Sequence, residues 1–269
     1  MKMKKWAVLV AAGALVASFA LFGCSSGATT DSKANGGNVA DAGYTLINDG
    51  KLTVAASLDF PPFENLNGNK PEGFAVDLMG LLAEEMGLEV NYLPSTKFDT
   101  IVPLIQTGGK ADIGVSSFTV TDERLAQIDF SDTYCDVNQS ITVLKTSGIT
   151  DVKQLEGKKV GAQTGTTGYE WAAENIKGVE VVGFDEMTAV FAALQSGQID
   201  AVAVDLPVAN YYVKTAYTDC QVIKEIPTGE QYAVVVSKEN PELTKALNTA
   251  LKAVKENGKY AELEAKWLQ

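Results

Sequence analysis

The sequence predicts an α/β protein in which buried strands alternate with amphipathic helices. The run KLTVAAS over residues 51–57 has the apolar content of a buried strand, and AVDLMGLLAEEM over residues 75–86 has the spacing of an amphipathic helix. The same alternation occurs again further along the chain with different spacing. Strands that alternate with helices pair in parallel through right-handed crossovers, so we expect two α/β units.

Each unit is built from short elements. The first unit is predicted to contain strand 51–57, helix 75–86, strand 88–93, helix 98–107 and strand 111–116. The second is predicted to contain strand 140–145, short helix 151–155, strand 159–163, helix 167–176, strand 179–184, helix 185–196 and strand 201–205. A further strand over 232–237 and two closing helices over 241–258 and 259–268 complete the chain.

The N-terminus has the pattern of an export signal. Three lysines at positions 2, 4 and 5 precede an apolar stretch over residues 6–22, and Gly23 and Cys24 follow. The pattern resembles a bacterial lipoprotein signal, which implies that residues 1–23 are removed and that Cys24 carries lipid. The alternative is an uncleaved anchor helix, but the apolar stretch is shorter than the roughly 20 residues that span a bilayer.

Composition excludes several classes of function. Residues 24–43 are rich in Ser, Gly, Asn, Asp and Ala and predict a flexible tether. The net charge of −12 disfavours nucleic acid as a partner. The chain contains no histidine, so Ser-His-Asp and Cys-His catalysis are absent; we predict no metal site and no cofactor. Cys135 and Cys220 form either a disulfide or two buried thiols, and their spacing does not decide between these.

Arg124 is the only arginine, while the other basic residues are all lysines. A planar guanidinium matches the two oxygens of a carboxylate in a way that an ammonium cannot. We therefore predict that Arg124 binds a carboxylate. The alternative is a surface arginine paired with Asp122 or Glu123.

Polar residues collect where predicted strands end. Ser117, Thr119 and Arg124 follow strand 111–116, a Gly- and Thr-rich run follows strand 159–163, and Asp205 ends strand 201–205. In open α/β sheets ligands bind at the carboxyl ends of strands. A free α-amino acid needs donors for its carboxylate and an acid for its ammonium, and Arg124, the amides of residues 165–167 and Asp205 meet that requirement.

Structural roles for the same residues stay open at this point. Thr121 is a plausible helix N-cap, and Asp205 could cap a helix that begins at residue 206. Phe60 and Phe98 could be ordinary core aromatics. The glycine-rich run over 161–168 matches neither dinucleotide-binding nor P-loop spacing, so a nucleotide site is excluded.

Several runs carry a family resemblance: FPPFE (60–64), GFAVDL (73–78), TVTDER (119–124), DFSDTY (129–134), QTGTT (163–167) and IDA (199–201). They resemble the polar amino-acid substrate-binding proteins of ABC importers, whose ligand-binding core is shared with ionotropic glutamate receptors. The resemblance covers about residues 50–269. Ala75 departs from it, because the family normally has an acid at that position.

The resemblance implies a two-lobed periplasmic-binding-protein type II fold that closes on its ligand. Each lobe is then a mostly parallel sheet flanked by helices, and two crossing strands near residues 135–139 and 227–231 join the lobes. Lobe 1 would comprise residues 44–136 plus 231–269, and lobe 2 residues 137–230. A monomer is expected.

The resemblance also implies roles for individual residues. Arg124, with the amides of Thr119 and Thr167, would bind the α-carboxylate, and Gly165 lies in the same loop. Asp205, with the Ser117 carbonyl and the Thr119 hydroxyl, would bind the α-ammonium.

Four further residues would surround the ligand side chain. Phe60 and Phe98 would sandwich it, and Ser57 and Gln163 would face its tip. Family members that take basic amino acids often carry an aspartate at the position of Ser57, so a neutral polar ligand such as glutamine or cystine is predicted. A basic ligand such as arginine is the alternative, if Asp59 or Glu64 reaches the pocket.

The implied function is a lipid-anchored extracytoplasmic receptor that passes an amino acid to an ABC permease and its ATPase. It is not an enzyme. The rival is a dehydratase of the cyclohexadienyl (prephenate or arogenate) type on the same scaffold. That chemistry needs a general acid aimed into the cleft, for which Glu64 and Asp59 are the nearest candidates.

Overall fold

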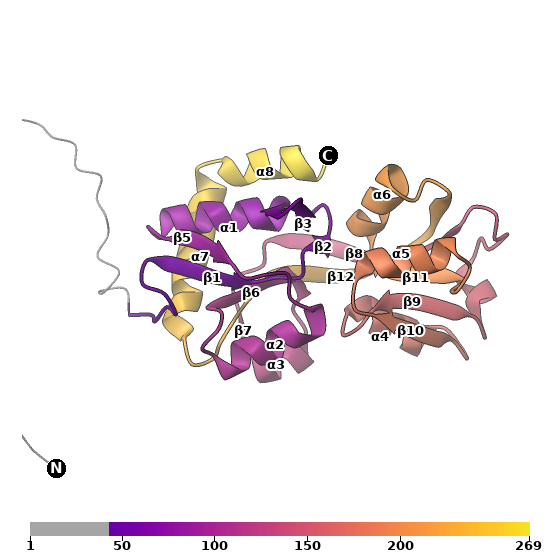
Figure 1. The fold of residues 1–269 in the computed structure, drawn as a ribbon, viewed down its shortest axis with the longest axis horizontal. Coiled ribbons are helices and arrows are strands. Elements are labelled where there is room, and N and C mark those ends of the chain that lie inside the picture. The colour runs from indigo at the N-terminus through magenta and orange to yellow at the C-terminus, as the bar shows by residue number, and fades with distance from the viewer. Residues whose placement is uncertain (1–42) are drawn as a thin grey trace, which may run out of the picture. The chain divides into compact units, whose positions relative to one another are not determined.

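A computed structural model describes residues 43–269 (Figure 1). The predicted signal segment 1–23, the lipidation site Cys24 and the tether up to residue 42 lie outside the described residues. Within residues 43–269, no helix is both long and apolar enough to cross a bilayer.

The described residues form the predicted α/β architecture. The strands are β1 (Lys51–Ala55), β2 (Asp59–Phe60), β3 (Glu64–Asn67), β4 (Lys70–Glu72), β5 (Glu89–Tyr92), β6 (Ile113–Thr119), β7 (Asp129–Phe130), β8 (Cys135–Leu144), β9 (Lys159–Gln163), β10 (Glu180–Phe184), β11 (Ala201–Asp205) and β12 (Cys220–Val236). The helices are α1 (Phe74–Glu85), α2 (Phe98–Thr107), α3 (Asp122–Gln127), α4 (Thr167–Asn175), α5 (Met187–Gln195), α6 (Leu206–Thr215), α7 (Pro241–Glu256) and α8 (Lys259–Trp267), with a 3₁₀ helix, η2, at Val152–Leu155.

The elements fall into two groups in Figure 1. We call the group with β1, β5, β6, α1, α2, α3, α7 and α8 lobe 1, and the group with β9, β10, β11, α4, α5 and α6 lobe 2. The sheet runs through both in the order β10-β9-β11-β8-β12-β6-β1-β5. β1, β5 and β6 pair in parallel, as do β9, β10 and β11, whereas β8 and β12 are antiparallel to each other and to the strands beside them.

Hydrophobic residues cover both faces of this sheet. One cluster spans the α1 and α7 side of lobe 1 and the α5 and α6 side of lobe 2. A second lies beneath α2, and a third lies beneath α4. Parallel strands buried on both faces read as continuous apolar runs, which is why β1 and β11 were predictable from sequence.

Three strands are longer than predicted. β6 extends to Thr119 because it pairs with β12 up to the Tyr232–Thr119 position. β8 begins at Cys135 and β12 at Cys220, because the polar residues before each predicted start pair with the other strand. Ser117 and Thr119 therefore lie within β6, not in a loop after it.

Smaller elements also differ from the prediction. The short helix predicted over 151–155 is the 3₁₀ helix η2, with Asp151 as its N-cap. The three-stranded sheet of β2, β3 and β4 was not predicted, because its strands are short and polar.

The two cysteines of the described chain are free thiols. Cys135 pairs with Tyr232 and Cys220 with Leu144, so the thiols lie at opposite ends of the β8–β12 ladder. At about 3.3 Å per residue, that separation is roughly 30 Å, far beyond the reach of a disulfide.

The segment between β2 and α1 is held by backbone contacts. The amides of Phe74 and Ala75 donate to the carbonyls of Pro62 and Phe63 at 2.9 and 3.0 Å. Gly73 has φ 134°, and a Cβ atom there would lie 2.2 Å from the Phe63 oxygen. Ala75 is fully buried, so the acid that the family usually has there would be costly in this chain. The close approach positions the loop that carries Phe60.

We expect Gly73→Ala to lower the free energy of unfolding by about 2–4 kcal/mol, because the backbone must move to admit the methyl group. Gly68→Ala is the matched control: its φ is 63° and nothing lies within 4 Å of the added carbon. It should cost only about 1 kcal/mol. Urea unfolding of both variants tests this, and equal losses would contradict it.

Candidate functional site

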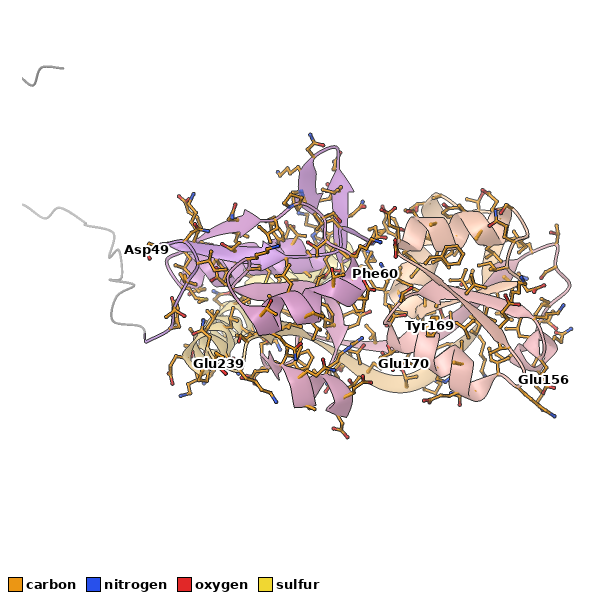
Figure 2. All side chains as sticks on the ribbon, turned by 60° about the horizontal axis from the view of Figure 1, so that its bottom comes forward. Asp49, Phe60, Glu156, Tyr169, Glu170 and Glu239 are labelled. Atoms are coloured by element: carbon orange, nitrogen blue, oxygen red, sulfur yellow. The ribbon has the colours of Figure 1, made fainter. Side chains whose placement is uncertain are left out.

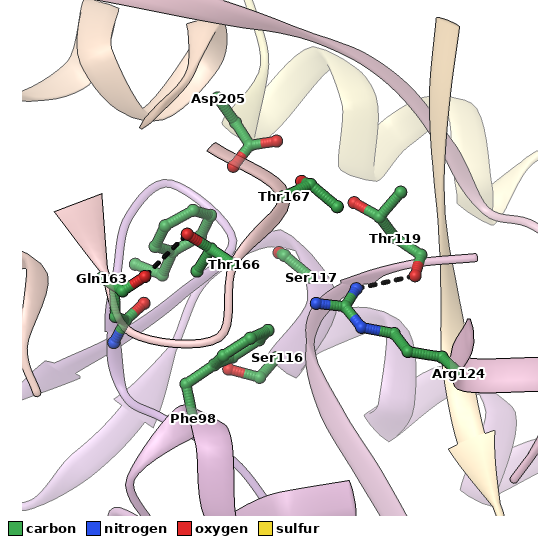
Figure 3. A pocket seen from close by; sticks show the side chains of 10 residues that line it. Phe98, Ser116, Ser117, Thr119, Arg124, Gln163, Thr166, Thr167 and Asp205 are labelled. Atoms are coloured by element: carbon green, nitrogen blue, oxygen red, sulfur yellow. Dashed lines mark hydrogen bonds between the residues drawn. The ribbon is translucent and has the colours of Figure 1, made fainter. Parts of the chain in front are cut away.

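A small cavity of about 10 Å³ lies between lobe 1 and lobe 2 (Figure 3). It is lined by Phe60, Phe98, Ser116, Ser117, Thr119, Arg124, Gln163, Thr166, Thr167 and Asp205. All but Ser116 and Thr166 were predicted site residues. Figure 2 shows Phe60 on the side of lobe 1 that faces lobe 2, and Glu170 of α4 on the side of lobe 2 that faces lobe 1.

The lining residues meet because strand ends and helix starts converge on the cavity. Ser117 and Thr119 end β6, Gln163 ends β9 and Asp205 ends β11. Phe98 and Thr167 are the first residues of α2 and α4. The carboxyl ends of the strands therefore form the site, as expected for an open α/β sheet.

Arg124 is half-buried and bonds to backbone oxygens of both lobes. Its Nη1 donates to the Thr119 carbonyl at 2.7 Å, and its Nη2 donates to the Gly165 carbonyl at 2.9 Å. The guanidinium carbon lies 5.5 Å from the ring centres of both Phe98 and Phe118. Burial lowers the pKa of Arg124 from its usual value.

No carboxylate within residues 43–269 forms an ion pair with Arg124. The alternative of a surface arginine paired with Asp122 or Glu123 is therefore wrong. A guanidinium has five N–H donors, so donors remain for a ligand. Thr121 is the N-cap of α3, and its hydroxyl accepts a hydrogen bond from the Arg124 amide at 3.2 Å. This bond holds the backbone of Arg124 in the first turn of the helix.

Asp205 is buried, with 6% of its surface exposed. It precedes α6, yet its side chain makes no capping hydrogen bond, so the capping alternative is not what the structure shows. One carboxylate oxygen instead accepts from Gln139 Nε2 at 3.0 Å. Burial, with the nearby charge of Glu230, raises the pKa of Asp205 to about 7.

Ser117 lies at the base of the cavity in a strained conformation. Among the described non-glycine residues, it alone has a positive φ, of 50°. The buried carboxylate of Glu64 accepts from its amide at 3.0 Å and its hydroxyl at 2.8 Å. These two bonds offset the roughly 1–2 kcal/mol that the left-handed conformation costs. Burial raises the pKa of Glu64 to about 8.

Ser57 does not line this cavity. It lies in a neighbouring hollow with Asp59, Lys97 and Asp185. Ser57 Oγ donates to Asp59 Oδ1 at 2.7 Å, and Asp59 Oδ2 accepts from the Met187 amide at 2.6 Å, at the start of α5. Lys97 forms an ion pair with Asp185. Gln163 connects the two spaces, because it lines the cavity and donates to the Asp185 carbonyl at 3.0 Å.

The aromatic residues serve the core and the cavity together. Phe98 stacks on Phe118, with ring centres 4.5 Å apart, and Phe60 packs in the main cluster. Each also lines the cavity. Gly165 lies at the outer edge beside Arg124 and Glu170, and its contribution to the site is the carbonyl that Arg124 bonds.

Two polar residues near the cavity carried no recognisable sequence signal. Gln139 of β8 donates to Asp205, and Glu230 of β12 accepts from Thr119 and Thr167. Both lie in the strands that cross between the lobes. Polar residues there look like exposed strand positions in the sequence, and only the pairing of β8 with β12 turns them toward the site.

Comparison with known proteins agrees with this architecture. Residues 52–269 match the sequence profile of the bacterial extracellular solute-binding proteins, family 3. A probable histidine-binding protein of Neisseria gonorrhoeae is 32% identical over 99% of this chain and 96% of its own length. The L-cystine-binding protein TcyJ of Escherichia coli strain K12 is 31% identical over 81% of this chain and 82% of its own length.

Solved structures share the fold. An ancestral arginine-binding protein bound to arginine superposes with a TM-score of 0.77 and 37% identity, covering 82% of this chain and 99% of that one. The two-lobed sheet flanked by helices is thus the type II periplasmic-binding-protein fold. By its profile and its fold, the chain belongs to the bacterial extracellular solute-binding proteins of family 3.

Proposed function

We propose that the protein is an extracytoplasmic receptor that captures one free α-amino acid between its lobes and delivers it to the permease and ATPase of an ABC importer. One observation carries the proposal: Arg124 and Asp205 line the same cavity and form no ion pair with each other among the described residues. Relatives named for binding histidine and cystine support it.

Charge complementarity sets the orientation of the ligand. The remaining donors of Arg124, with the amides of Thr119 and Thr167, take the α-carboxylate. Asp205, the Ser117 carbonyl and the Thr119 hydroxyl take the α-ammonium. Each ligand charge then has a partner, which matters because a buried unpaired ion costs several kcal/mol.

The ligand side chain lies between Phe60 and Phe98 and points past Gln163 toward Ser57. A neutral polar amino acid such as glutamine or cystine is the first candidate, since the cavity wall at this end carries no charge. Arginine is the second candidate, because the Asp59 carboxylate lies 2.7 Å from Ser57 Oγ. A ligand side chain that donates hydrogen bonds suits both the uncharged cavity wall and the Asp59 carboxylate, whereas an acidic side chain suits neither.

Closure brings the lobes together through polar contacts. Arg124 of lobe 1 donates to the Gly165 carbonyl, and Asp59 accepts from the Met187 amide. Lys97 forms an ion pair with Asp185. We infer that lobe 1 comprises residues 44–136 plus 231–269, that lobe 2 comprises residues 137–230, and that a monomer closes about β8 and β12. A ligand can shift this closure only by its preference for the closed form.

Attachment to the membrane is proposed through lipid on Cys24, with residues 24–43 as the tether. About 20 such residues have a root-mean-square reach of roughly 25 Å. That reach lets the folded body approach a permease in the same membrane.

The dehydratase alternative lacks the two acids that were predicted for it. Glu64 is covered by Ser117, and neither Glu64 nor Asp59 lines the cavity. The named relatives are binding proteins as well. The protein is therefore a receptor and not an enzyme.

Arg124→Lys is expected to weaken amino-acid binding by about 30-fold to several thousand-fold, because breaking a buried charge pair costs about 2–5 kcal/mol. The ammonium cannot reproduce the two-pronged geometry. Isothermal calorimetry measures the loss. The matched control is Asp122→Asn, an exposed neighbour in α3, which should leave affinity unchanged. Unchanged affinity in the lysine variant excludes the carboxylate role.

Asp205 should make binding pH-dependent. Its folded pKa of about 7 lies above the ordinary aspartate value of 3.8, so the folded protein binds more protons than the unfolded chain between these two pH values. Without amino acid, this group's contribution to stability is therefore fully present below about pH 4 and is lost as pH rises through 7. Binding requires the ionised form, so affinity should fall about tenfold per pH unit below 7.

Titration calorimetry between pH 5 and 8 checks this expectation. Asp205→Asn should bind weakly at every pH and lose the dependence, while its thermal transition remains cooperative. An affinity in the wild-type protein that stays constant from pH 8 to 5 contradicts the assignment of Asp205 to the ammonium.

Competition among amino acids identifies the side chain. We expect glutamine or cystine to displace a bound ligand at lower concentration than arginine, lysine, glutamate or aspartate, because neither brings a net charge to an uncharged part of the cavity wall. Asp59→Asn separates the two candidates. It should change glutamine affinity less than about threefold, whereas arginine would lose a charge-assisted bond and at least about tenfold in affinity. If arginine binds the wild type most tightly and loses that affinity in Asp59→Asn, the prediction of a neutral ligand is wrong.

A further inference from the structure

Glu230 joins both lobes through a single carboxylate oxygen. Its Oε2 accepts from Thr167 Oγ1 at 2.6 Å, from Thr119 Oγ1 at 2.8 Å and from Gln139 Nε2 at 3.2 Å. Thr119 belongs to lobe 1, Thr167 to lobe 2 and Gln139 to the crossing strand β8. Glu230 itself lies in β12, the second crossing strand, opposite Val137.

The donors at this oxygen have fixed roles. A carboxylate only accepts hydrogen bonds, so the hydroxyls of Thr119 and Thr167 must donate to Glu230. Once its proton is directed at Glu230, the Thr119 hydroxyl keeps its lone pairs free for another donor. Both threonines line the cavity. Glu230 therefore determines which way two cavity hydroxyls present their acceptor sites.

Gln139 connects Glu230 to Asp205. Its Nε2 atom lies within hydrogen-bond distance of Asp205 Oδ1, at 3.0 Å, and of Thr167 Oγ1, at 3.1 Å, as well as of Glu230. No cation within residues 43–269 forms an ion pair with Glu230. Near Asp205, where we place the ligand ammonium, the side-chain amide of Gln139 therefore bonds two acidic side chains, Asp205 and Glu230.

We propose that Glu230 is a positioning residue that acts as a latch: it holds the lobes together in the closed form and orients the Thr119 hydroxyl toward the ammonium of the bound amino acid. The proposal rests on the proposed function for its ligand. A purely structural role in strand pairing is the competing explanation, and Glu225 supplies the comparison. Glu225 lies in the same strand and accepts from Asn138 at 2.7 Å, but it is exposed and its partner is not a residue that lines the cavity.

The test uses the purified full-length chain with L-glutamine and L-arginine as probes in calorimetry. Glu230→Ala should weaken binding of the probe that the wild type prefers by at least about tenfold, and Glu230→Gln by less, because an amide oxygen can still accept from the two hydroxyls. Glu225→Gln should stay within about twofold of the wild type. The melting temperatures of all three variants should remain close to that of the wild type.

A double-mutant cycle shows whether Glu230 acts through Thr119. In a Thr119→Val background, Glu230→Ala should cause a smaller loss than in the wild type, because one of its two hydroxyl partners is already gone. Additive losses, or an unchanged affinity in Glu230→Ala, overturn the proposal. If Glu230→Ala and Glu225→Gln both lower the melting temperature and weaken ligand binding equally, the proposal is also overturned, and the role of Glu230 is structural pairing of the strands.

The latch can be judged even if the proposed function fails. If the wild type binds no amino acid, small-angle scattering of the chain alone decides the matter. Glu230→Ala should then increase the radius of gyration relative to the wild type and to Glu225→Gln. Identical radii overturn the latch.

Discussion

Two opposite charges line one cavity without pairing with each other, and the other features of the site are arranged around them. Arg124 and Asp205 both line the cavity, yet no ion pair joins them among the described residues. Desolvating such groups without partners is costly. The backbone carbonyls of Thr119 and Gly165 and the amide of Gln139 supply partial compensation. The proposed zwitterionic ligand would complete it, because its carboxylate and its ammonium would each face one of the two charges.

The scaffold serves this constraint through strand ends and a few close contacts. The strands of the two lobes run in opposite directions, so their carboxyl ends face each other and bring Thr119 of lobe 1 to the same cavity as Gln163 and Asp205 of lobe 2. The buried Glu64 carboxylate holds Ser117 in its left-handed conformation, and the contact of Gly73 with Phe63 positions the loop that carries Phe60. β8 and β12 run through both lobes, so a side chain from these strands, such as Glu230, can bond residues of both lobes at once.

Much of this was predictable from sequence for identifiable physical reasons. Apolar runs buried on both faces predicted β1, β9 and β11, and polar residues near predicted strand ends, among them Arg124 and Asp205, line one cavity as expected. The first part of β12 was missed because its polar residues, with Pro227 and Gly229, lack any strand-like alternation. Glu230 was missed with it. Ser57 was expected at the cavity wall, but its hydroxyl turns to Asp59, a side-chain choice that sequence pattern does not encode.

Ligand derivatives that lack one charged group show whether the protein recognises the α-amino and α-carboxyl groups together. Calorimetry should compare the preferred amino acid with its decarboxylated amine and its N-acetyl derivative; for glutamine these are 4-aminobutanamide and N-acetylglutamine. We expect each derivative to bind at least about 30-fold more weakly, since each leaves one buried protein charge without its partner. If either derivative binds within threefold of the parent amino acid, the pairing of Arg124 and Asp205 with the two ligand charges is contradicted.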